Sequence, residues 1–330
     1  MTTKQDVLAC LQQARDYLSG EQIAQALDIS RAAVWKWIDA LRREGYEIES
    51  RSGRGYRLLS TPDVMTQAAV LAQLGRHPWA ERVTVLPTVD STNTALKRMA
   101  ADGAPDGTIL IADEQTGGRG RLGRQFDSPP GMGLYLSVLL RPQGQAAAAT
   151  HATLRAGLAV ADAVEAVTGL QVGIKWPNDL VYGTQKLCGI LSEMGVEAES
   201  GRMDWLIVGI GVNCNQLAGD FPPELRSMAA SLRQCCGQPV LRARLAAELI
   251  RQLTALEDDL ADPSRYLPRY AARCITLHRE VQLARAGTLI HAVATGIAPD
   301  GGLEVRLDDG SAAVFGSGEV SVRGMYGYCE

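Results

Sequence analysis

Residues 1–60 carry hydrophobic side chains at the three- and four-residue spacing of amphipathic helices. Ser19 and Gln22 form a capping-box sequence, which begins the second of three predicted helices. Ser30 caps the third predicted helix, and Gly45 ends it. The inward-facing positions are Val7, Leu8, Leu11 and Leu18 in the first helix, Ile23 and Leu27 in the second, and Val34, Trp37, Ile38 and Leu41 in the third.

A change of pattern follows these helices. Two strand-like stretches, at 46–50 and 56–59, flank a glycine-rich turn. They predict a β-hairpin, which Pro62 ends. Strands and helices then alternate up to about residue 270, as in an α+β domain, and only short strands with Gly- and Asp-rich turns follow, as in a small β-barrel. The predicted strands are 46–50, 56–59, 83–86, 108–112, 134–140, 187–193, 205–212, 281–284, 289–297, 303–307, 312–315 and 320–322, and the predicted later helices are 94–101, 153–167 and 241–260.

The length and composition fit this organisation. A chain of 330 residues with 46% hydrophobic and 21% charged residues is typical of a soluble globular protein with two or three domains. We place the domains at 1–62, 63–268 and 269–330. The net charge of -4 excludes a polycationic nucleic-acid binder, so any contact with DNA requires a local basic surface.

The seven cysteines are odd in number and form no C-x-x-C pair, which argues against a disulfide framework or a structural zinc site. No signal peptide and no membrane-length apolar run is found in the sequence, so we expect a cytoplasmic protein with no membrane partner.

The third predicted helix has the features of a recognition helix in a helix-turn-helix domain. Small residues at its start would allow a close approach to base edges, and the arginines of the following hairpin could grip phosphates. A three-helix domain used for protein contact is the alternative. The candidate DNA-binding residues are Ser30, Arg31, Ala32, Ala33, Trp35, Lys36, Arg51 and Arg54, with Arg57 also on the hairpin.

A glycine-rich loop at residues 115–124 contains three arginines, Arg119, Arg121 and Arg124. Glycines let backbone N–H groups approach an anion, and guanidinium groups offer paired donors to phosphate or carboxylate oxygens. The loop is neither a P-loop nor a Rossmann fingerprint. It suits a mobile segment that closes over an anionic ligand, although a flexible basic surface loop or a single-strand nucleic-acid tether fits nearly as well.

Three further motifs each have a plain structural explanation beside a functional one. Lys175 and Lys186 could pair an anion or be solvated ends of strands. Residues 90–93 could simply cap a helix or bind a polar ligand at its N-terminus. Residues 209–213 could form a tight strand bend or place the Asn213 amide beside a nucleotide.

Taken together, these strings resemble the biotin–protein ligases. Residues 115–124, QTGGRGRLGR, are similar to the glycine-arginine ligand loop of that family. KWPNDL at 175–180 with KLCGIL at 186–191, and GIGVN at 209–213, resemble its other two blocks. SGEQIAQALDISRAAVWKWIDALR at 19–42 and SGRGYRL at 52–58 resemble the DNA-binding domain of its bifunctional members, the biotin–[acetyl-CoA-carboxylase] ligases that are also biotin operon repressors (the BirA family).

The resemblance implies a winged helix-turn-helix, a central class II synthetase-like mixed-sheet ligase domain and an SH3-like C-terminal barrel. It implies that biotin and ATP form biotinoyl-5′-AMP with Mg²⁺ present, and that biotin then passes to a lysine of the biotin carboxyl carrier protein. It also implies that the adenylate-bound homodimer binds operator DNA and represses biotin synthesis genes.

The resemblance also assigns residues. Lys186, Arg121 and Arg119 are the implied catalytic groups, with no metal site made by protein ligands alone, since Mg²⁺ arrives with ATP. Two departures from the family pattern are Leu122, where an arginine is usual, and Phe126, where the type member has tryptophan. The implied biotin-binding residues are Ser91, Thr92, Asn93, Gln115, Arg119, Gly120, Arg121, Lys186 and Gly189, and the implied ATP- or adenylate-binding residues are Arg121, Arg124, Phe126, Lys175, Asn178 and Asn213.

Three rival functions remain at this point. A lipoate–protein ligase or octanoyltransferase shares the general fold. A transcription factor could use the central domain only to sense a small molecule. A ligase could retain the helix-turn-helix as a scaffold without repressing.

Overall fold

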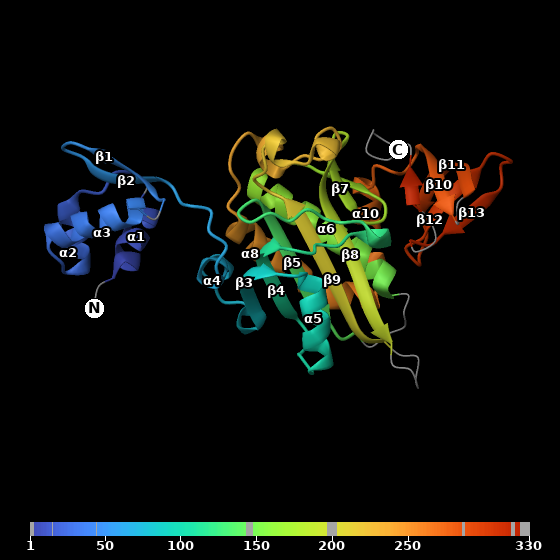
Figure 1. The fold of residues 1–330 in the computed structure, drawn as a ribbon, viewed down its shortest axis with the longest axis horizontal. Helices are drawn as coiled ribbons and strands as arrows, with labels where there is room; N and C mark the ends of the chain where they lie inside the picture. The colour runs from blue at the N-terminus through green and yellow to red at the C-terminus, as the bar shows by residue number, and fades with distance from the viewer. Residues whose placement is uncertain are drawn as a thin grey trace. The chain divides into compact units, whose positions relative to one another are not determined.

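The computed structural model describes residues 3–14, 16–43, 45–142, 148–196, 203–285, 288–317 and 321–323. The chain divides into two compact units, Met1–Asp63 and Val64–Glu330 (Figure 1).

The first unit has the predicted helices and hairpin. The capping box is present, because Ser19 Oγ accepts from Gln22 N at 3.1 Å and Gln22 Oε1 accepts from Ser19 N at 2.8 Å. Ser30 Oγ likewise accepts from Ala33 N at 3.1 Å. The elements are α1 (Lys4–Gln13), α2 (Gly20–Leu27), α3 (Arg31–Arg43), β1 (Glu47–Arg51) and β2 (Gly55–Ser60), and β1 pairs antiparallel with β2.

The prediction that Leu18 belongs to the first helix is wrong. Helix α1 ends at Gln13, and Leu18 instead forms a backbone bridge with Tyr56 of the hairpin, with N–H to O distances of 2.9 and 2.8 Å. Leu18 still packs against the core of this unit. Its apolar character therefore predicted its packing correctly, but its spacing predicted the wrong secondary-structure element.

The second unit is built on a mixed seven-stranded sheet in the order β3-β4-β5-β9-β8-β7-β6. Strands β3 and β4 are parallel, and all other neighbours are antiparallel. The strands are β3 (Val83–Val89), β4 (Thr108–Gln115), β5 (Gly133–Leu140), β6 (Gly173–Lys175), β7 (Asp179–Tyr182), β8 (Gln185–Val196) and β9 (Met203–Asn213).

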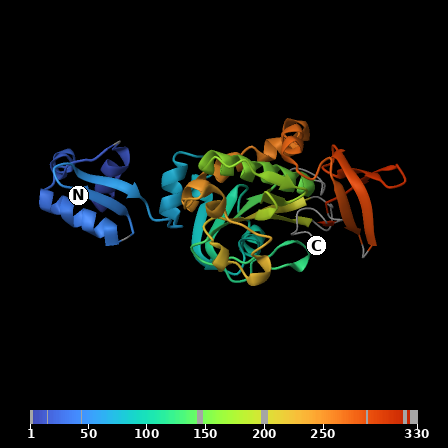
Figure 2. The ribbon, with the colours of Figure 1, turned by 90° about the horizontal axis from the view of Figure 1, so that it is seen from above.

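Helices cover the two faces of this sheet unequally. The main core packs α4, α6, α8 and α10 against one face, and Figure 2 shows α6 along that face. A smaller cluster packs Leu96 and Ala100 of α5 against Leu139 and Ile207 on the other face. The second face therefore leaves room beside α5 for a ligand. The helices are α4 (Gln67–Leu74), α5 (Thr92–Ala101), α6 (Ala148–Thr168), α7 (Leu232–Cys236), α8 (Arg242–Leu253), α9 (Leu256–Ala261) and α10 (Leu267–Arg273), with short 3-10 turns at Ala80–Arg82, Arg121–Gly123, Ala218–Asp220, Pro223–Leu225 and Pro263–Arg265.

The predicted single helix at 241–260 is wrong, because the chain forms two helices, α8 and α9, with a break at Thr254 and Ala255. At that break the Thr254 hydroxyl donates to the carbonyl of Arg251 at 2.6 Å, which satisfies a terminal carbonyl of α8. The apolar periodicity continues across residues 254 and 255, so the sequence pattern could not reveal the break.

The last part of the chain is the predicted all-strand region. Five antiparallel strands lie in the order β13-β12-β11-β10-β14 and enclose Leu283, Ala294, Val305 and Phe315. The strands are β10 (Glu280–Arg285), β11 (Thr288–Ile297), β12 (Leu303–Leu307), β13 (Ala312–Phe315) and β14 (Ser321–Arg323). The α+β class with a helix-turn-helix, a mixed central sheet and a C-terminal antiparallel sheet is thus confirmed. None of the helices in the described part of the chain has the length and apolar character that a bilayer crossing requires.

Candidate active site

The floor of the site is a patch of glycines on the sheet face beside α5. A Cβ on Gly209 would lie 2.1 Å from Asn93 Oδ1, and a Cβ on Gly211 would lie 2.6 Å from Phe126 Cε1. A Cβ on Gly189 of the adjacent strand would lie 3.2 Å from Lys186 Nζ and 3.6 Å from Phe126 Cε2. Only glycine lets Asn93 and Phe126 lie this close to the sheet.

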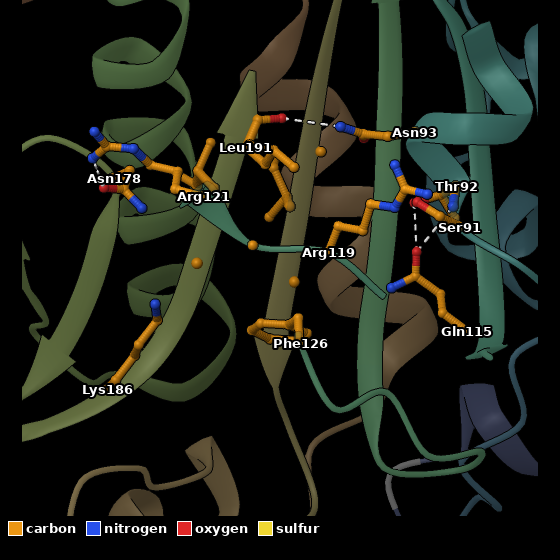
Figure 3. A pocket seen from close by; sticks show the side chains of 16 residues that line it. Ser91, Thr92, Asn93, Gln115, Arg119, Arg121, Phe126, Asn178, Lys186 and Leu191 are labelled. Carbon is orange, nitrogen blue, oxygen red and sulfur yellow. Dashed lines mark hydrogen bonds between the residues drawn. The ribbon is translucent and has the colours of Figure 1, made fainter. Parts of the chain in front are cut away.

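A hydrogen-bond network fixes the start of α5 above this floor (Figure 3). Ser137 Oγ lies 2.7 Å from both Thr92 Oγ1 and Asn93 Oδ1. Asn93 Nδ2 donates to Glu193 Oε2 at 2.7 Å, and Thr92 donates through its N–H and its hydroxyl to Gln115 Oε1 at 2.9 and 3.0 Å. The side chains of Thr92 and Asn93 are therefore engaged with the protein and act as a rigid wall of the cleft.

Ser91 occupies the N-cap position of α5 but uses its side chain differently from a capping serine. Among the described residues its hydroxyl makes no capping hydrogen bond, although the residue is only 4% exposed and lines the cavity. The plain explanation of this motif as a helix cap is therefore wrong for Ser91. Ser91 lies at the N-terminus of α5, the positive end of the helix dipole, and its binding of a ligand stays a prediction.

A chain of polar contacts holds two cations on the opposite side of the cleft. Arg121 Nη1 donates to Asn178 Oδ1 at 2.7 Å, and Asn178 Nδ2 donates to Asp179 Oδ1 at 2.9 Å. Lys186 Nζ pairs with the same Asp179 oxygen at 2.7 Å. Burial lowers the pKa of Arg121, and the nearby Asp179 carboxylate opposes this effect. One carboxylate thus orients two positive side chains before any anion is bound.

The glycine-arginine loop bends back on itself before it enters the cleft. Gly120 N donates to Arg124 O at 2.7 Å, and Phe126 N donates to Gly118 O at 2.9 Å. Figure 3 shows Phe126 above the glycine floor and Arg119 directed toward the start of α5. Arg121 also donates to the backbone carbonyl of Ser317 in the C-terminal region.

Two adjoining cavities result. The inner one, of about 60 Å³, lies between the start of α5 and the glycine floor, and the outer one, of about 270 Å³, extends past Phe126. Both are lined by Gly120, Arg121, Phe126 and Lys186, so the cations lie where the cavities meet. The outer cavity also has an apolar wall suited to a flat ring, made by Phe221, Leu225, Met228 and Ala229.

Comparisons with known proteins agree with this geometry. Residues 85–213 match the Biotin/lipoate A/B protein ligase family, residues 3–57 match an HTH domain, and residues 276–323 match the Biotin protein ligase C terminal domain. The chain is 32% identical over 312 residues to the bifunctional ligase/repressor BirA of Escherichia coli, which covers 93% of this chain and 94% of that protein. The chain belongs to the BirA family of biotin protein ligases.

Other members of the family are also similar. The Bacillus subtilis bifunctional ligase/repressor BirA is 38% identical over 250 residues, which is 76% of each chain. The structure of Aquifex aeolicus biotin protein ligase in complex with biotin and ATP superposes with a TM-score of 0.63 at 30% identity, covering 73% of this chain and 98% of that one.

The structure brings together the residues that the sequence analysis predicted for biotin and ATP. Phe126, assigned to the adenine, lines both cavities, and so do Arg121 and Asn178. The assignment of each residue to a ligand stays a prediction. The inner cavity contains Ser91, Thr92, Asn93, Gln115, Arg119, Gly120, Lys186 and Gly189, and the outer one contains Arg124, Lys175 and Asn213.

Several residues of this site have no assigned role in the sequence motifs. Asp179 and Gly211 stood inside quoted motifs but received no role. Ser137 and Glu193 lie within apolar strands, where the only signal is a polar residue on one face of the strand. Gln216 lines the outer cavity, and its Oε1 is buried with no hydrogen-bond partner among the described residues.

The predicted DNA-binding residues lie in the first unit. Ser30 caps α3, and Arg31, Ala32, Ala33, Trp35 and Lys36 form its first turns. Trp35 is 62% exposed, so its side chain is accessible on the surface of this unit. Arg51 and Arg54 lie at the hairpin turn. Their contact with DNA stays a prediction.

We predict that Gly209→Ala lowers the free energy of unfolding of the second unit by about 1–3 kcal/mol. The new methyl group would displace the Asn93 amide from its partners, the buried Ser137 and the half-buried Glu193. Thermal and urea unfolding measure the loss. The matched control is Gly219→Ala, since a Cβ there meets nothing within 4 Å. Equal stability of the two variants would show that the network does not depend on this glycine.

Proposed function

We propose that this protein joins biotin to ATP and then transfers it to a carrier protein, and that it also represses transcription. The observation that carries the proposal is the pair Arg121 and Lys186, oriented by Asn178 and Asp179 at the junction of the two cavities. The bifunctional relatives and the ligase structure with biotin and ATP support the same assignment.

The first step brings two anions together. The carboxylate of biotin, in the inner cavity, attacks the α-phosphorus of ATP in the outer cavity, which gives biotinoyl-5′-AMP and releases pyrophosphate. Arg121 and Lys186 reduce the repulsion between carboxylate and phosphate and stabilise the charge that develops during attack. Arg119 completes the group of catalytic cations on the biotin side.

The nucleotide fits the outer cavity by its chemistry. Arg124 and Lys175 offer positive charge, while Phe221 and Met228 offer an apolar wall for the adenine. We assign Asn213 and the unpartnered amide oxygen of Gln216 to the nucleotide side, together with Phe126.

Magnesium fits as an ion carried by ATP. The described residues contain no group of three or more His, Cys, Asp or Glu side chains that could hold a metal. The outer cavity does contain the oxygen donors Asp127, Asp179 and Asn178, and Mg²⁺ is commonly held by one or two carboxylates together with substrate phosphates. When bound, the ion would neutralise phosphate charge.

The second step forms an amide. The neutral amine of a lysine on the biotin carboxyl carrier protein attacks the acyl carbon of the anhydride, the acyl–oxygen bond breaks, and AMP leaves. The loop at residues 115–124 shields the anhydride from water until that amine arrives.

The decisive experiment mixes the protein with ATP, an apo carrier domain, and either biotin or lipoate. We expect pyrophosphate release and carrier modification with biotin alone. Incorporation of lipoate would favour the rival ligase, and the absence of pyrophosphate release with biotin would favour a ligand-sensing transcription factor.

We predict that Lys186→Ala lowers biotin-dependent pyrophosphate release about 100-fold or more, because the reacting anions lose an oriented counter-charge. A coupled pyrophosphate assay measures the rate. The control is Arg76→Ala, which removes an exposed cation that lines neither cavity. A rate within twofold of the control would exclude a catalytic role for Lys186.

We predict that Arg121→Gly releases preformed biotinoyl-5′-AMP about 10- to 100-fold faster than the wild type. This range corresponds to the loss of one or two charge-assisted hydrogen bonds. Stopped-flow dissociation of labelled adenylate measures it. An unchanged off-rate would mean that Arg121 contacts only the protein groups Asn178 and Ser317.

For the regulatory activity, we propose that the adenylate favours a homodimer whose two recognition helices bind an operator with two-fold symmetry. The six cysteines in the described part of the chain form no disulfide, which, together with the substrates ATP and biotin, suits the cytoplasm.

We predict that duplex DNA from upstream of this gene binds more tightly when biotin and ATP are both present than with either alone. Gel-shift titration measures affinity, and sedimentation velocity reports the dimer. Lys186→Ala, which we expect to form the adenylate about 100-fold more slowly, should show little response to the two ligands within an incubation that gives the full wild-type response, while keeping basal DNA binding. A wild-type response identical without ATP would exclude the adenylate as the effector.

A further inference from the structure

Three arginines of the hairpin gather around one tyrosine that the proposed function does not use. The guanidinium carbons of Arg51, Arg54 and Arg57 lie 5.4, 4.6 and 5.2 Å from the centre of the Tyr17 ring. Each of these separations is within the range of a cation–π interaction. One aromatic ring therefore contacts every arginine of the hairpin that the sequence analysis singled out.

The backbone explains why they meet there. The strand register places Glu49 opposite Arg57, with Arg51 two residues further along the same face of β1. Arg54 lies in the turn that joins the strands. The bridge between Leu18 and Tyr56 fixes the segment that carries Tyr17 beside the hairpin.

The charges of this cluster do not balance. Asp16 pairs with Arg54 at 2.7 Å, and Glu49 lies 3.9 Å from Arg51 and accepts the Tyr17 hydroxyl hydrogen bond. Among the described residues, two carboxylates thus face three guanidinium groups, and like charges gathered around one ring repel one another. The side chains of Arg51 and Arg54 remain 55% and 48% exposed, so they keep donors for a further anion.

We propose that Tyr17 is the positioning residue of a phosphate-binding site for the DNA backbone, holding Arg51, Arg54 and Arg57 together so that their outer N–H groups grip one stretch of phosphates. The proposal rests on the DNA binding proposed above and adds a residue outside the recognition helix and the hairpin. An aromatic ring contacts the flat face of each guanidinium group. The N–H groups at the edges remain available to donate to phosphate oxygens.

This role predicts a particular signature. Phosphate contacts carry no base information, so loss of the ring should weaken binding equally on all sequences and reduce the dependence of affinity on salt. A residue that merely stabilised the domain would change the melting temperature and leave the salt dependence of the folded protein unchanged.

The experiment uses the full chain and two duplexes of equal length, one from upstream of this gene and one of unrelated sequence. Dissociation constants are measured across a series of KCl concentrations for the wild type, Tyr17→Phe, Tyr17→Leu and the control Tyr182→Leu, which removes an exposed tyrosine of the second unit. We expect Tyr17→Leu to weaken binding to both duplexes roughly tenfold and to lower the salt slope by about one or more. Tyr17→Phe, which keeps the ring, and Tyr182→Leu should both behave as the wild type.

A double-mutant cycle tests whether Tyr17 acts through the arginines. In an Arg54→Gln background, Tyr17→Leu should cost less affinity than it does alone. Full additivity, equal binding by Tyr17→Leu and wild type, or a loss in Tyr17→Phe as large as in Tyr17→Leu would each overturn the proposal.

Two control measurements distinguish failure of this proposal from failure of DNA binding and from misfolding of the variant. If the wild type binds neither duplex at any salt concentration, the proposed DNA binding itself fails. Far-UV circular dichroism shows whether Tyr17→Leu folds. If it does not, Arg54→Gln and Arg57→Gln are each combined with Tyr17→Phe and compared with Tyr17→Phe alone. The proposal requires that each arginine change lower the salt slope, and it falls if either leaves the slope unchanged.

Discussion

The repulsion between a carboxylate and a polyphosphate is the constraint on which the site depends. A protein that must bring them together needs cations already in place. Flexible cations would have to reorganise during the reaction, and this reorganisation would reduce their stabilisation of the transition state. Asp179 meets this need by binding Lys186 directly and Arg121 through Asn178. The same arrangement explains why a negative residue belongs in a site for two anions: it holds the positive side chains until substrates replace part of its role.

The inner cleft follows a second constraint, which is that a flat sheet face offers no depth for a ligand. Glycines at 209 and 211 remove side chains from the floor. The hydrogen-bonded network of Ser137, Asn93 and Glu193 forms a wall of fixed shape beside it. Because each buried polar group in this wall has a partner, the cleft is rigid without being apolar. Ser91 differs from its neighbours in having a buried hydroxyl that does not cap its helix, which gives the cleft a donor at the helix terminus.

The sequence predicted the elements well where apolar periodicity and capping residues coincide, as at Ser19, Ser30 and the strands of the central sheet. It failed at Leu18 and Thr254, where the apolar pattern continued while the backbone changed direction. The site residues that carry recognisable motifs could be predicted. Ser137 and Glu193 could not, because their importance depends on strand register across the sheet, and register is a property of pairs of distant segments.

Leu122 shows how a departure from the family pattern can bear on function. It adopts a φ of +56°, a conformation that costs a branched side chain about 1 kcal/mol, and 75% of its surface is exposed. Its side chain therefore gains little burial to offset this cost. The compensation must come from the neighbours that the turn places, namely Arg121 against Asn178 and the backbone bond between Gly120 and Arg124. The backbone bond from Phe126 N to Gly118 O and the bond from Arg121 to the Ser317 carbonyl add to these interactions. Under the proposed function, the loop holds its anionic ligand with the three guanidinium groups of Arg119, Arg121 and Arg124, because the leucine offers no donor of its own.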